Sequence, residues 1–380
     1  MKLHLFNPEN DLALALDLAN YTPPPAAAAL GRSGATLPLW CGDAGDAVVC
    51  PGVNAEWLRR IRDSFGLRTD VWDHRPEGYE PAPWGWSKSS RKRFGMLGFD
   101  NAALPADDVL ERRRSLSSRR SSCILGEALT EAGLLPPGCG AELIGSIAEA
   151  RDYARRHADS LFKLPWSSSG RGQIRVGSPG EFAAREQALC GALRRYGFLT
   201  AEPFHRDKAV DLALLFEADT AGRVHPAGLS LFMTAANGDY AGNILASDAA
   251  IMEALDRRFG IADDIRQTEA ALRRALETLI DGAYAGPLGV DMMVLADGGL
   301  ISCVELNLRM TMGHVARRFH DRYCETDSTG LFTVGEHADA AAAPAEMRGG
   351  RLVLGHISLN PPGNPVSFTA GIQGEKNIFI

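Results

Sequence analysis

Polar side chains near residue 305 have the types and the spacing of a cation site. Side chains alternate along a strand, so Glu305, Asn307 and Arg309 are predicted to project from one face of a single strand. Asp291 lies on the preceding strand of a predicted hairpin and is expected to share that face. Two carboxylates and an amide oxygen are hard ligands of the kind that Mg²⁺ takes. A strand whose polar side chains contact only water is the alternative that these residues leave open.

A second candidate site follows Lys163, in a segment rich in serine and glycine at residues 165–172. Small residues between two strands let successive backbone N–H groups point into one concavity, which suits phosphate oxygens. Lys163, at the end of the preceding strand, is expected to supply a point charge. The segment lacks the Gly-x-x-x-x-Gly-Lys-Ser/Thr order of a Walker phosphate loop. A flexible hairpin that binds no ligand is the alternative.

Regular elements are predicted on both sides of these segments. Around Lys163 the expected order is helix, strand, glycine loop, strand and helix, over residues 142–160, 161–164, 165–172, 173–176 and 179–196. Strands at 2–6 and 47–50 begin an N-terminal α/β domain, and the prolines within 22–29 are predicted to open a helix. The second half is expected to be mixed and richer in antiparallel hairpins. Its predicted strands are 211–216, 289–295, 300–306 and 351–359, and one long helix is predicted at 264–284.

The composition, with 45% hydrophobic and 23% charged residues, is typical of soluble globular domains. A chain of 380 residues is expected to form more than one subdomain. The net charge of −7 gives no overall field that attracts nucleic acid or anionic membranes, so neither is expected as a partner. No apolar run approaches the roughly 18 to 20 residues of a membrane span, so a cytoplasmic protein is expected. The seven cysteines never form Cys-x-x-Cys and are predicted to be reduced.

Two basic clusters each allow two interpretations. The segment 75–95 places Trp84 and Trp86 among lysines and arginines, and aromatics next to cations can stack bases. A packed loop that leads into a basic, solvated helix is the favoured prediction for this segment. The run 111–120 contains five arginines and is predicted to be an exposed helix face, from which one or two arginines can turn toward a nucleotide.

In this order the motifs resemble the ATP-grasp superfamily, over roughly residues 120–315. The most specific parts are Gly-x-x-Gly-Val-Asp at 286–291 and Glu-x-Asn-x-Arg at 305–309. The short sequence segments 6–11 and 83–86 resemble those of a bacterial branch of this superfamily whose substrates are unassigned. A member of the superfamily would bind ATP between two subdomains.

The resemblance implies an α/β (α+β) fold, in which an N-terminal α/β pre-ATP-grasp domain precedes a two-subdomain ATP-grasp fold. The N-terminal domain would comprise residues 1–120. The small ATP-grasp subdomain, with its phosphate and lid loop, would comprise 121–200. The C-terminal subdomain with the metal site would comprise 201–380.

The same resemblance implies roles for individual residues. Lys163 would contact the nucleotide phosphates and, with Arg309, would be catalytic. The lid loop over those phosphates would comprise Ser168, Ser169, Gly170, Arg171 and Gly172. Glu202, at a hinge, would lie near the adenine, and Asp211 would bond the ribose. The metal ligands would be Asp291, Glu305 and Asn307.

The implied reaction is an ATP-dependent ligation that needs Mg²⁺, with Mn²⁺ as an alternative metal. A small-molecule carboxylate and an amine or other nucleophile would be joined through an acyl-phosphate. A kinase or other phosphotransferase on the same fold, and a non-catalytic nucleotide-binding protein, are the alternatives. The identities of the substrates and the oligomeric state are left open.

Three smaller points also stay open at this stage. The segment 7–11 follows the first strand and suits either a substrate contact or, as the favoured prediction, a helix cap by Asn10 or Asp11. The polar stretch 229–243 fits a substrate pocket or a solvated loop. An earlier basic residue of the family is matched by Arg119 or Arg120.

Overall fold

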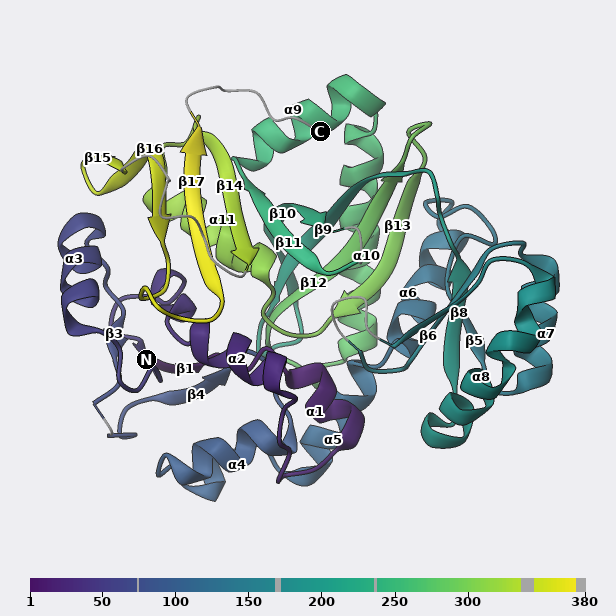
Figure 1. Cartoon of the computed structure of the whole chain (residues 1–380), viewed down its shortest axis with the longest axis horizontal. Coiled ribbons are helices and arrows are strands. Elements are labelled where there is room, and N and C mark those ends of the chain that lie inside the picture. The colour runs from purple at the N-terminus through teal and green to yellow at the C-terminus, as the bar shows by residue number, and fades with distance from the viewer. Residues whose placement is uncertain (74, 168–171, 236–237, 336–344, 374–380) are drawn as a thin grey trace.

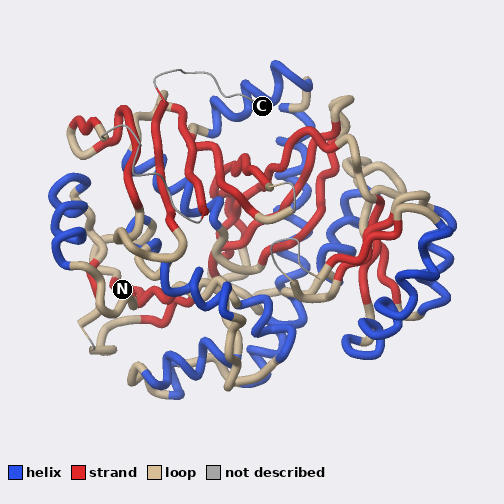
Figure 2. The backbone as a smooth tube through the Cα atoms, in the orientation of Figure 1, coloured by secondary structure: helices blue, strands red, loops and turns tan. Residues whose placement is uncertain are grey.

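The computed structural model describes residues 1–73, 75–167, 172–235, 238–335 and 345–373. Their strands form three sheets, two of four strands and one of nine, with helices packed around them (Figure 1). Helices and strands are mixed along the chain, as Figure 2 shows, so the predicted α/β class is confirmed. Within these ranges, none of the helices combines the length and the apolar character of a membrane span.

The N-terminal sheet is parallel, in the order β3-β2-β1-β4. Its strands are β1 (Lys2–Leu5), β2 (Ala47–Val48), β3 (Asp70–Val71) and β4 (Glu80–Pro83). The helices of this part are α1 (Asn10–Leu16), α2 (Pro25–Ser33), α3 (Ala55–Phe65), α4 (Lys88–Met96) and α5 (Asp107–Leu116), with short 3-10 turns at Leu37–Trp40 and Asn101–Ala103. Pro25 is the first residue of α2, where its missing N–H costs no helical bond, so the predicted helix start is confirmed.

The second sheet has the order β5-β8-β6-β7, and its neighbours are antiparallel. Its strands are β5 (Glu142–Ile144), β6 (Ser160–Lys163), β7 (Gln173–Val176) and β8 (Leu199–Pro203). The turn Pro179–Glu181 and the helices α7 (Ile147–Arg156) and α8 (Phe182–Tyr196) complete it. The predicted helix at 142–160 was wrong at both ends. Its first residues pair with β8 instead, and Ser146 caps the helix by accepting from the backbone N–H of Glu149.

The large sheet is antiparallel, in the order β13-β12-β9-β10-β11-β14-β17-β16-β15, as predicted for the second half of the chain. Its strands are β9 (Lys208–Ala218), β10 (Val224–Thr234), β11 (Tyr240–Leu245), β12 (Gly286–Leu295), β13 (Leu300–Asn307), β14 (Thr329–Gly335), β15 (Glu346–Arg348), β16 (Arg351–Ser358) and β17 (Ser367–Gln373). The helices packed against it are α6 (Arg120–Glu131), α9 (Asp248–Phe259), α10 (Ala262–Ile280) and α11 (Met312–Tyr323). Helix α10 ends before the predicted residue 284, because Asp281 adopts a left-handed conformation with φ 44°.

One hydrophobic cluster joins the N-terminal sheet to the β14–β17 side of the large sheet. Phe6, which follows β1, packs edge-on against Trp84 with ring centroids 4.8 Å apart and against Phe368 of β17 at 6.4 Å. Trp40 packs in the same way against Phe319 of α11 at 5.5 Å. These contacts bury large apolar surfaces from both ends of the chain, so the N-terminal layer is held firmly against the large sheet.

Candidate active site

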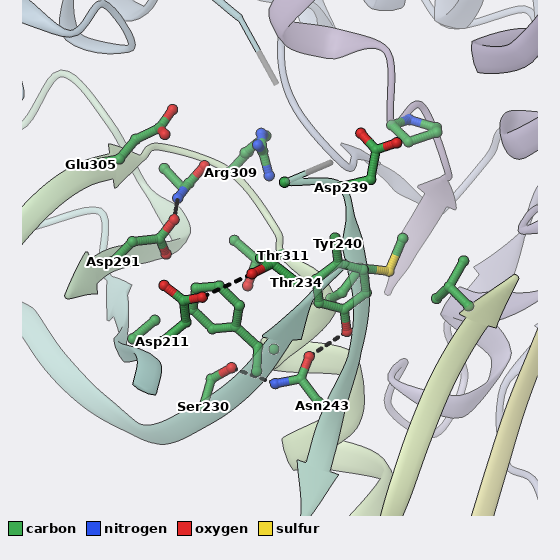
Figure 3. A pocket seen from close by; sticks show the side chains of 18 of the residues that line it. Asp211, Ser230, Thr234, Asp239, Tyr240, Asn243, Asp291, Glu305, Arg309 and Thr311 are labelled. Carbon is green, nitrogen blue, oxygen red and sulfur yellow. Dashed lines mark hydrogen bonds between the residues drawn. The ribbon is translucent and has the colours of Figure 1, made fainter. Parts of the chain in front are cut away.

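A cavity of about 460 Å³ lies against the large sheet, within the size range of small-molecule sites. It brings together Lys163 of the second sheet and Asp211, Asp291 and Glu305 of the large sheet. Glu9 of the N-terminal layer also lines it. Figure 3 shows that polar side chains from several strands face this space. Residues that are far apart in the sequence therefore share one pocket.

The predicted carboxylate pair is present. Asp291 of β12 lies directly opposite Glu305 of β13 in the antiparallel register, so both side chains are on the same face. Desolvation, and then the negative charge of Glu305, raise the pKa of Asp291 to about 7. The amide nitrogen of Asn307 donates to Oδ2 of Asp291 at 3.0 Å. Two acids held this close favour a cation between them.

The oxygen atoms of Asp291, Glu305 and Asn307 are ligands that suit a hard divalent cation. Among the residues that the structure describes, no group bonds Oδ1 of Asp291 or Oε1 of Glu305, and the amide oxygen of Asn307 is also left without a partner. The described residues contain no cluster of three or more His, Cys, Asp or Glu side chains that could hold a metal. Two carboxylates and one amide suit Mg²⁺, which keeps water and substrate oxygens as its other ligands.

Lys163 is held by its neighbours in the second sheet. Its ammonium group forms an ion pair with Glu202, which lies diagonally across on the adjacent strand β8. Both side chains are largely buried, with exposed fractions of 4% and 11%. β8 is followed along the chain by β9 of the large sheet, so residues 204–207, just after Glu202, connect the two sheets. Lys163 lines the cavity from this second sheet.

The predicted order of strand, glycine loop and strand after residue 160 is confirmed, because β6 pairs with β7 on either side of the loop. Gly172 has φ 69°, a conformation that favours glycine, and a Cβ there would lie 2.8 Å from the side chain of Leu164. The backbone N–H of Leu164 donates to the carbonyl of Gly172 at 3.0 Å and closes the base of the loop. The predicted lid residues Ser168, Ser169, Gly170 and Arg171 lie outside the described residues.

Arg119 connects the two candidate segments. Its Nη1 forms an ion pair with Oε2 of Glu305 at 2.9 Å, and its Nη2 donates to Oγ of Ser167 at 3.2 Å. Its Nε also donates to the carbonyl of Leu164 at 3.1 Å. Arg120 instead stacks on the ring of Phe198, 4.8 Å from the ring centroid. Of the two arginines that the sequence left open, Arg119 is therefore the one at the site.

Arg309 lines the cavity, but it lies beyond the end of β13 at Asn307, so the prediction that it projects from the same strand as Glu305 was wrong. Asp11 of α1 accepts from Nε and Nη2 of Arg309 at 3.0 and 2.7 Å. Burial opposes the charge of Arg309, but Asp11, Glu305 and Asp291 together raise its pKa above the ordinary value. The prediction that Asn10 or Asp11 caps a helix was wrong. Both lie inside α1, whose first turn has no side-chain cap, and Asp11 is used by Arg309 instead.

The segment 6–11 is fastened to the loop after β4. The side-chain amide of Asn7 donates to the carbonyl of Gly85 at 2.9 Å and accepts from its N–H at 3.3 Å. A Cβ on Gly85 would lie 2.4 Å from the side chain of Asn10, so a larger residue would displace this contact. The backbone N–H of Met310 donates to the carbonyl of Trp84 at 3.0 Å. These bonds fix the position of the residues around Arg309, a link that no local sequence pattern predicts.

The basic segment 75–95 is a packed loop followed by helix α4, as the favoured prediction stated. Trp84 is buried, with 6% of its surface exposed. Lys88 of α4 forms an ion pair with Asp17 at 2.5 Å, and Arg93 forms one with Glu9 at 3.3 Å. The tryptophan is thus part of the core, and these cations are paired within the protein.

Polar residues of β10 and β11 form the floor of the cavity (Figure 3), so of the two alternatives for 229–243 the described residues favour a pocket lining over a solvated loop. The amide of Asn243 donates to Oγ of Ser230 at 2.6 Å, and its oxygen accepts from the hydroxyl of Tyr240. Asp211 of β9 accepts from Thr234 Oγ1 at 3.1 Å. It also accepts from the Lys208 ammonium group at 2.5 Å. Asn237 lies outside the described residues.

No protein-family model and no curated protein matches the sequence. Solved structures match it with a similar fold. The biotin carboxylase domain of the 2-oxoglutarate carboxylase from Hydrogenobacter thermophilus, in complex with MgADP, ADP and bicarbonate, is 13% identical over 84% of each chain, with a TM-score of 0.50. The biotin carboxylase from Campylobacter jejuni, in complex with β-γ-ATP, is 12% identical over 98% of this chain and 87% of that one, with a TM-score of 0.50.

A third match is pyruvate carboxylase from Rhizobium etli with the activator acetyl coenzyme A. It is 13% identical, with a TM-score of 0.51, and the match covers 98% of this chain and 36% of that chain. At such low identities the likeness concerns the fold, because one fold hosts many reactions.

Proposed function

Because the chain has the ATP-grasp fold, with an N-terminal domain ahead of the ATP-grasp part, we propose that it is an ATP- and Mg²⁺-dependent ligase. The reaction would join a carboxylate to an amine or other nucleophile through an acyl-phosphate. One observation carries this proposal. Lys163 from the second sheet lines the same cavity as Asp291 and Glu305, which face each other on the large sheet. A phosphate-binding cation and a pair of metal-binding carboxylates are the groups that phosphoryl transfer needs.

In the proposed site, Asp291, Glu305 and Asn307 hold Mg²⁺, and Lys163 contacts the nucleotide phosphates. A bound Mg²⁺ would neutralise charge on the phosphate oxygens. The lid loop Ser168 to Gly172 would close over those phosphates. Asp211, which lines the cavity, is proposed to bond the ribose. Glu202, ion-paired with Lys163, holds this lysine in position, and its proposed place is near the adenine.

The chemistry proceeds in two displacements. A carboxylate oxygen of the substrate attacks the γ-phosphorus, the bond from that phosphorus to the β–γ bridging oxygen breaks, and ADP leaves. The nucleophile then attacks the acyl carbon, phosphate leaves, and an amine nucleophile loses a proton. Arg309, whose guanidinium is fixed by Asp11, presents donors to the transferring phosphoryl group or to the tetrahedral species of the second step.

The test is ADP release from Mg·ATP by wild type and Glu305→Ala, with pooled carboxylates and pooled amines added separately and together. The ligase predicts release that needs both pools and is lost in Glu305→Ala. Glu253→Ala, which removes a carboxylate from the exposed surface of α9, is the matched control and should behave as wild type. If wild type releases ADP at the full rate with one pool alone, the enzyme is a phosphotransferase rather than a ligase. If wild type does not bind ATP, the proposal is overturned.

A further inference from the structure

The cavity has a second end that the proposed reaction does not use. Away from the carboxylate pair it extends beneath α1 and α2, where its wall is apolar. The residues of this apolar end are Leu12, Ala26, Ala27, Leu30, Met312 and Val334. They come from α1, α2, α11 and β14, so the N-terminal layer and the large sheet build it together.

Helix α2 forms the roof of this end with one face. Ala26, Ala27 and Leu30 lie on the same side of a helix, and the small side chains of the two alanines leave room above the sheet. Helix α2 is anchored at its C-terminal end to the segment that precedes β17. Oγ of Ser33 accepts from the backbone N–H of Val366 at 3.2 Å, and the amide of Asn360 donates to the carbonyl of Ser33 at 3.0 Å. The roof therefore has a fixed position over the apolar end.

Charged side chains line the cavity on both sides of its apolar end. Arg309 precedes Met312 at the turn that begins α11, so the donors at the reactive end and the apolar wall adjoin each other. Glu9 lines the cavity close to α2, with one oxygen 3.3 Å from Arg93 and only 12% of its side chain exposed. A ligand that carried a second negative charge into this end would be repelled by Glu9 and would lose its hydration.

We propose that the apolar end binds the hydrocarbon body of the carboxylate substrate, whose carboxylate lies at Arg309 and the acidic pair. The substrate class is then a monocarboxylic acid with an aliphatic or aromatic body, rather than a short or dicarboxylic acid. This inference rests on the proposed function, because it takes the carboxylate to be the group that is phosphorylated. It adds a specificity that neither the fold nor the metal site determines.

The first experiment uses straight-chain monocarboxylates from acetate to octanoate, with saturating Mg·ATP and hydroxylamine as the nucleophile. ADP release and hydroxamate formation are measured together. Each methylene that enters the apolar end should raise kcat/KM by about fourfold, which corresponds to about 0.8 kcal/mol for a buried CH₂. Adipate should be at least about tenfold poorer than hexanoate, because its second carboxylate would face Glu9.

The second experiment fills the apolar end. Ala27→Phe should lower the ratio of kcat/KM for octanoate to that for propionate at least about tenfold, because the ring occupies the space of the distal methylenes. Ala28→Phe is the matched control, since Ala28 lies on the opposite side of α2 and should keep the wild-type ratio. ATP affinity should be unchanged in both variants.

The two proposals fail differently. Loss of ATP binding in wild type would overturn the proposed function and the inference with it. If ATP binds but no monocarboxylate of the series releases ADP, or if rates do not depend on chain length, the inference is overturned while the ATP-grasp site stands. Equal effects of Ala27→Phe and Ala28→Phe on the chain-length ratio would overturn it as well.

Discussion

Arg119 and Glu305 form an ion pair of 2.9 Å that joins the turn before α6 to strand β13. The same guanidinium donates to Leu164 and Ser167, at the start of the loop after β6. One arginine thus sets the position of that loop relative to the acidic pair. The exposed side-chain fractions are 7% for Arg119 and 23% for Glu305, so salt screens this ion pair less than it would a pair on the open surface.

Replacement of Arg119 tests this link. Arg119→Ala removes charge-assisted bonds to Glu305 and Ser167, so we expect affinity for Mg·ATP to fall by about 10- to 100-fold, or about 1.5–3 kcal/mol. Calorimetric titration with Mg·ATP measures it. Arg120→Ala, which removes the neighbouring arginine that stacks on Phe198, is the control and should bind within about threefold of wild type. If Arg120→Ala loses more affinity for Mg·ATP than Arg119→Ala does, Arg120 rather than Arg119 is the arginine that supports nucleotide binding.

Asp291→Asn should separate stability from metal binding. The substitution removes a negative charge that both desolvation and Glu305 oppose, so the metal-free variant should be more stable than wild type by about 1–3 kcal/mol. Thermal unfolding with and without Mg²⁺ measures this. Mg²⁺ should raise the Tm of wild type and leave that of Asp291→Asn unchanged. Asp263→Asn, at an exposed position, should respond to Mg²⁺ as wild type does. If Mg²⁺ raises the Tm of Asp291→Asn as much as it raises that of wild type, the assignment of Asp291 as a metal ligand is contradicted.

Arg309→Ala should reduce turnover without preventing nucleotide binding. The guanidinium is proposed to act on the transferring phosphoryl group, so kcat should fall by about 10²- to 10³-fold, as for the loss of one oxyanion donor. The dissociation constant for Mg·ATP should stay within about fivefold of wild type. Single-turnover kinetics and nucleotide titration measure the two quantities. Loss of nucleotide binding in this variant would refute this division of roles.

Asp11→Asn tests whether the N-terminal layer holds Arg309. Removal of one partner of a largely buried ion pair leaves an uncompensated charge, so the variant should lose about 3 kcal/mol of unfolding free energy. Chemical denaturation measures it. Asp17→Asn, at the end of the same helix, breaks an ion pair with Lys88 that is about twice as exposed and should cost less than about 1 kcal/mol. If the two variants lose the same unfolding free energy, the ion pair of Asp11 with Arg309 stabilises the fold no more than an exposed pair does.

A buried histidine gives stability a defined pH dependence. His314 accepts from Thr311 through Nδ1, and burial, then Arg318 and Arg309, lower the pKa of His314 to about 3. The unfolded chain binds a proton there near pH 6.5 whereas the folded chain does not, so this contribution is complete above pH 6.5 and is lost as the pH falls toward 3. Between pH 7.5 and 5.0, His314→Asn should lose about 2 kcal/mol less unfolding free energy than wild type. Equal losses would mean that His314 titrates normally.

The sequence by itself determined the parts of the site that rest on local geometry. The alternation of side chains along a strand is enough to align Glu305 with Asn307, and a short turn between two strands brings Asp291 opposite Glu305. Lys163 before a glycine loop is likewise a pattern within one hairpin. These predictions needed only the repeat of a strand and the chemistry of turns.

The tertiary structure alone decided which residues meet across the cavity. Asp11 and Arg309 are 298 positions apart, and they contact because Phe6 and Trp84 pack into one core with strands from the end of the chain. The apolar end of the cavity exists for the same reason, since α2 closes over β14 only when this core has formed. Such contacts depend on how whole layers pack, and that is set by the summed burial of many distant side chains rather than by any local pattern.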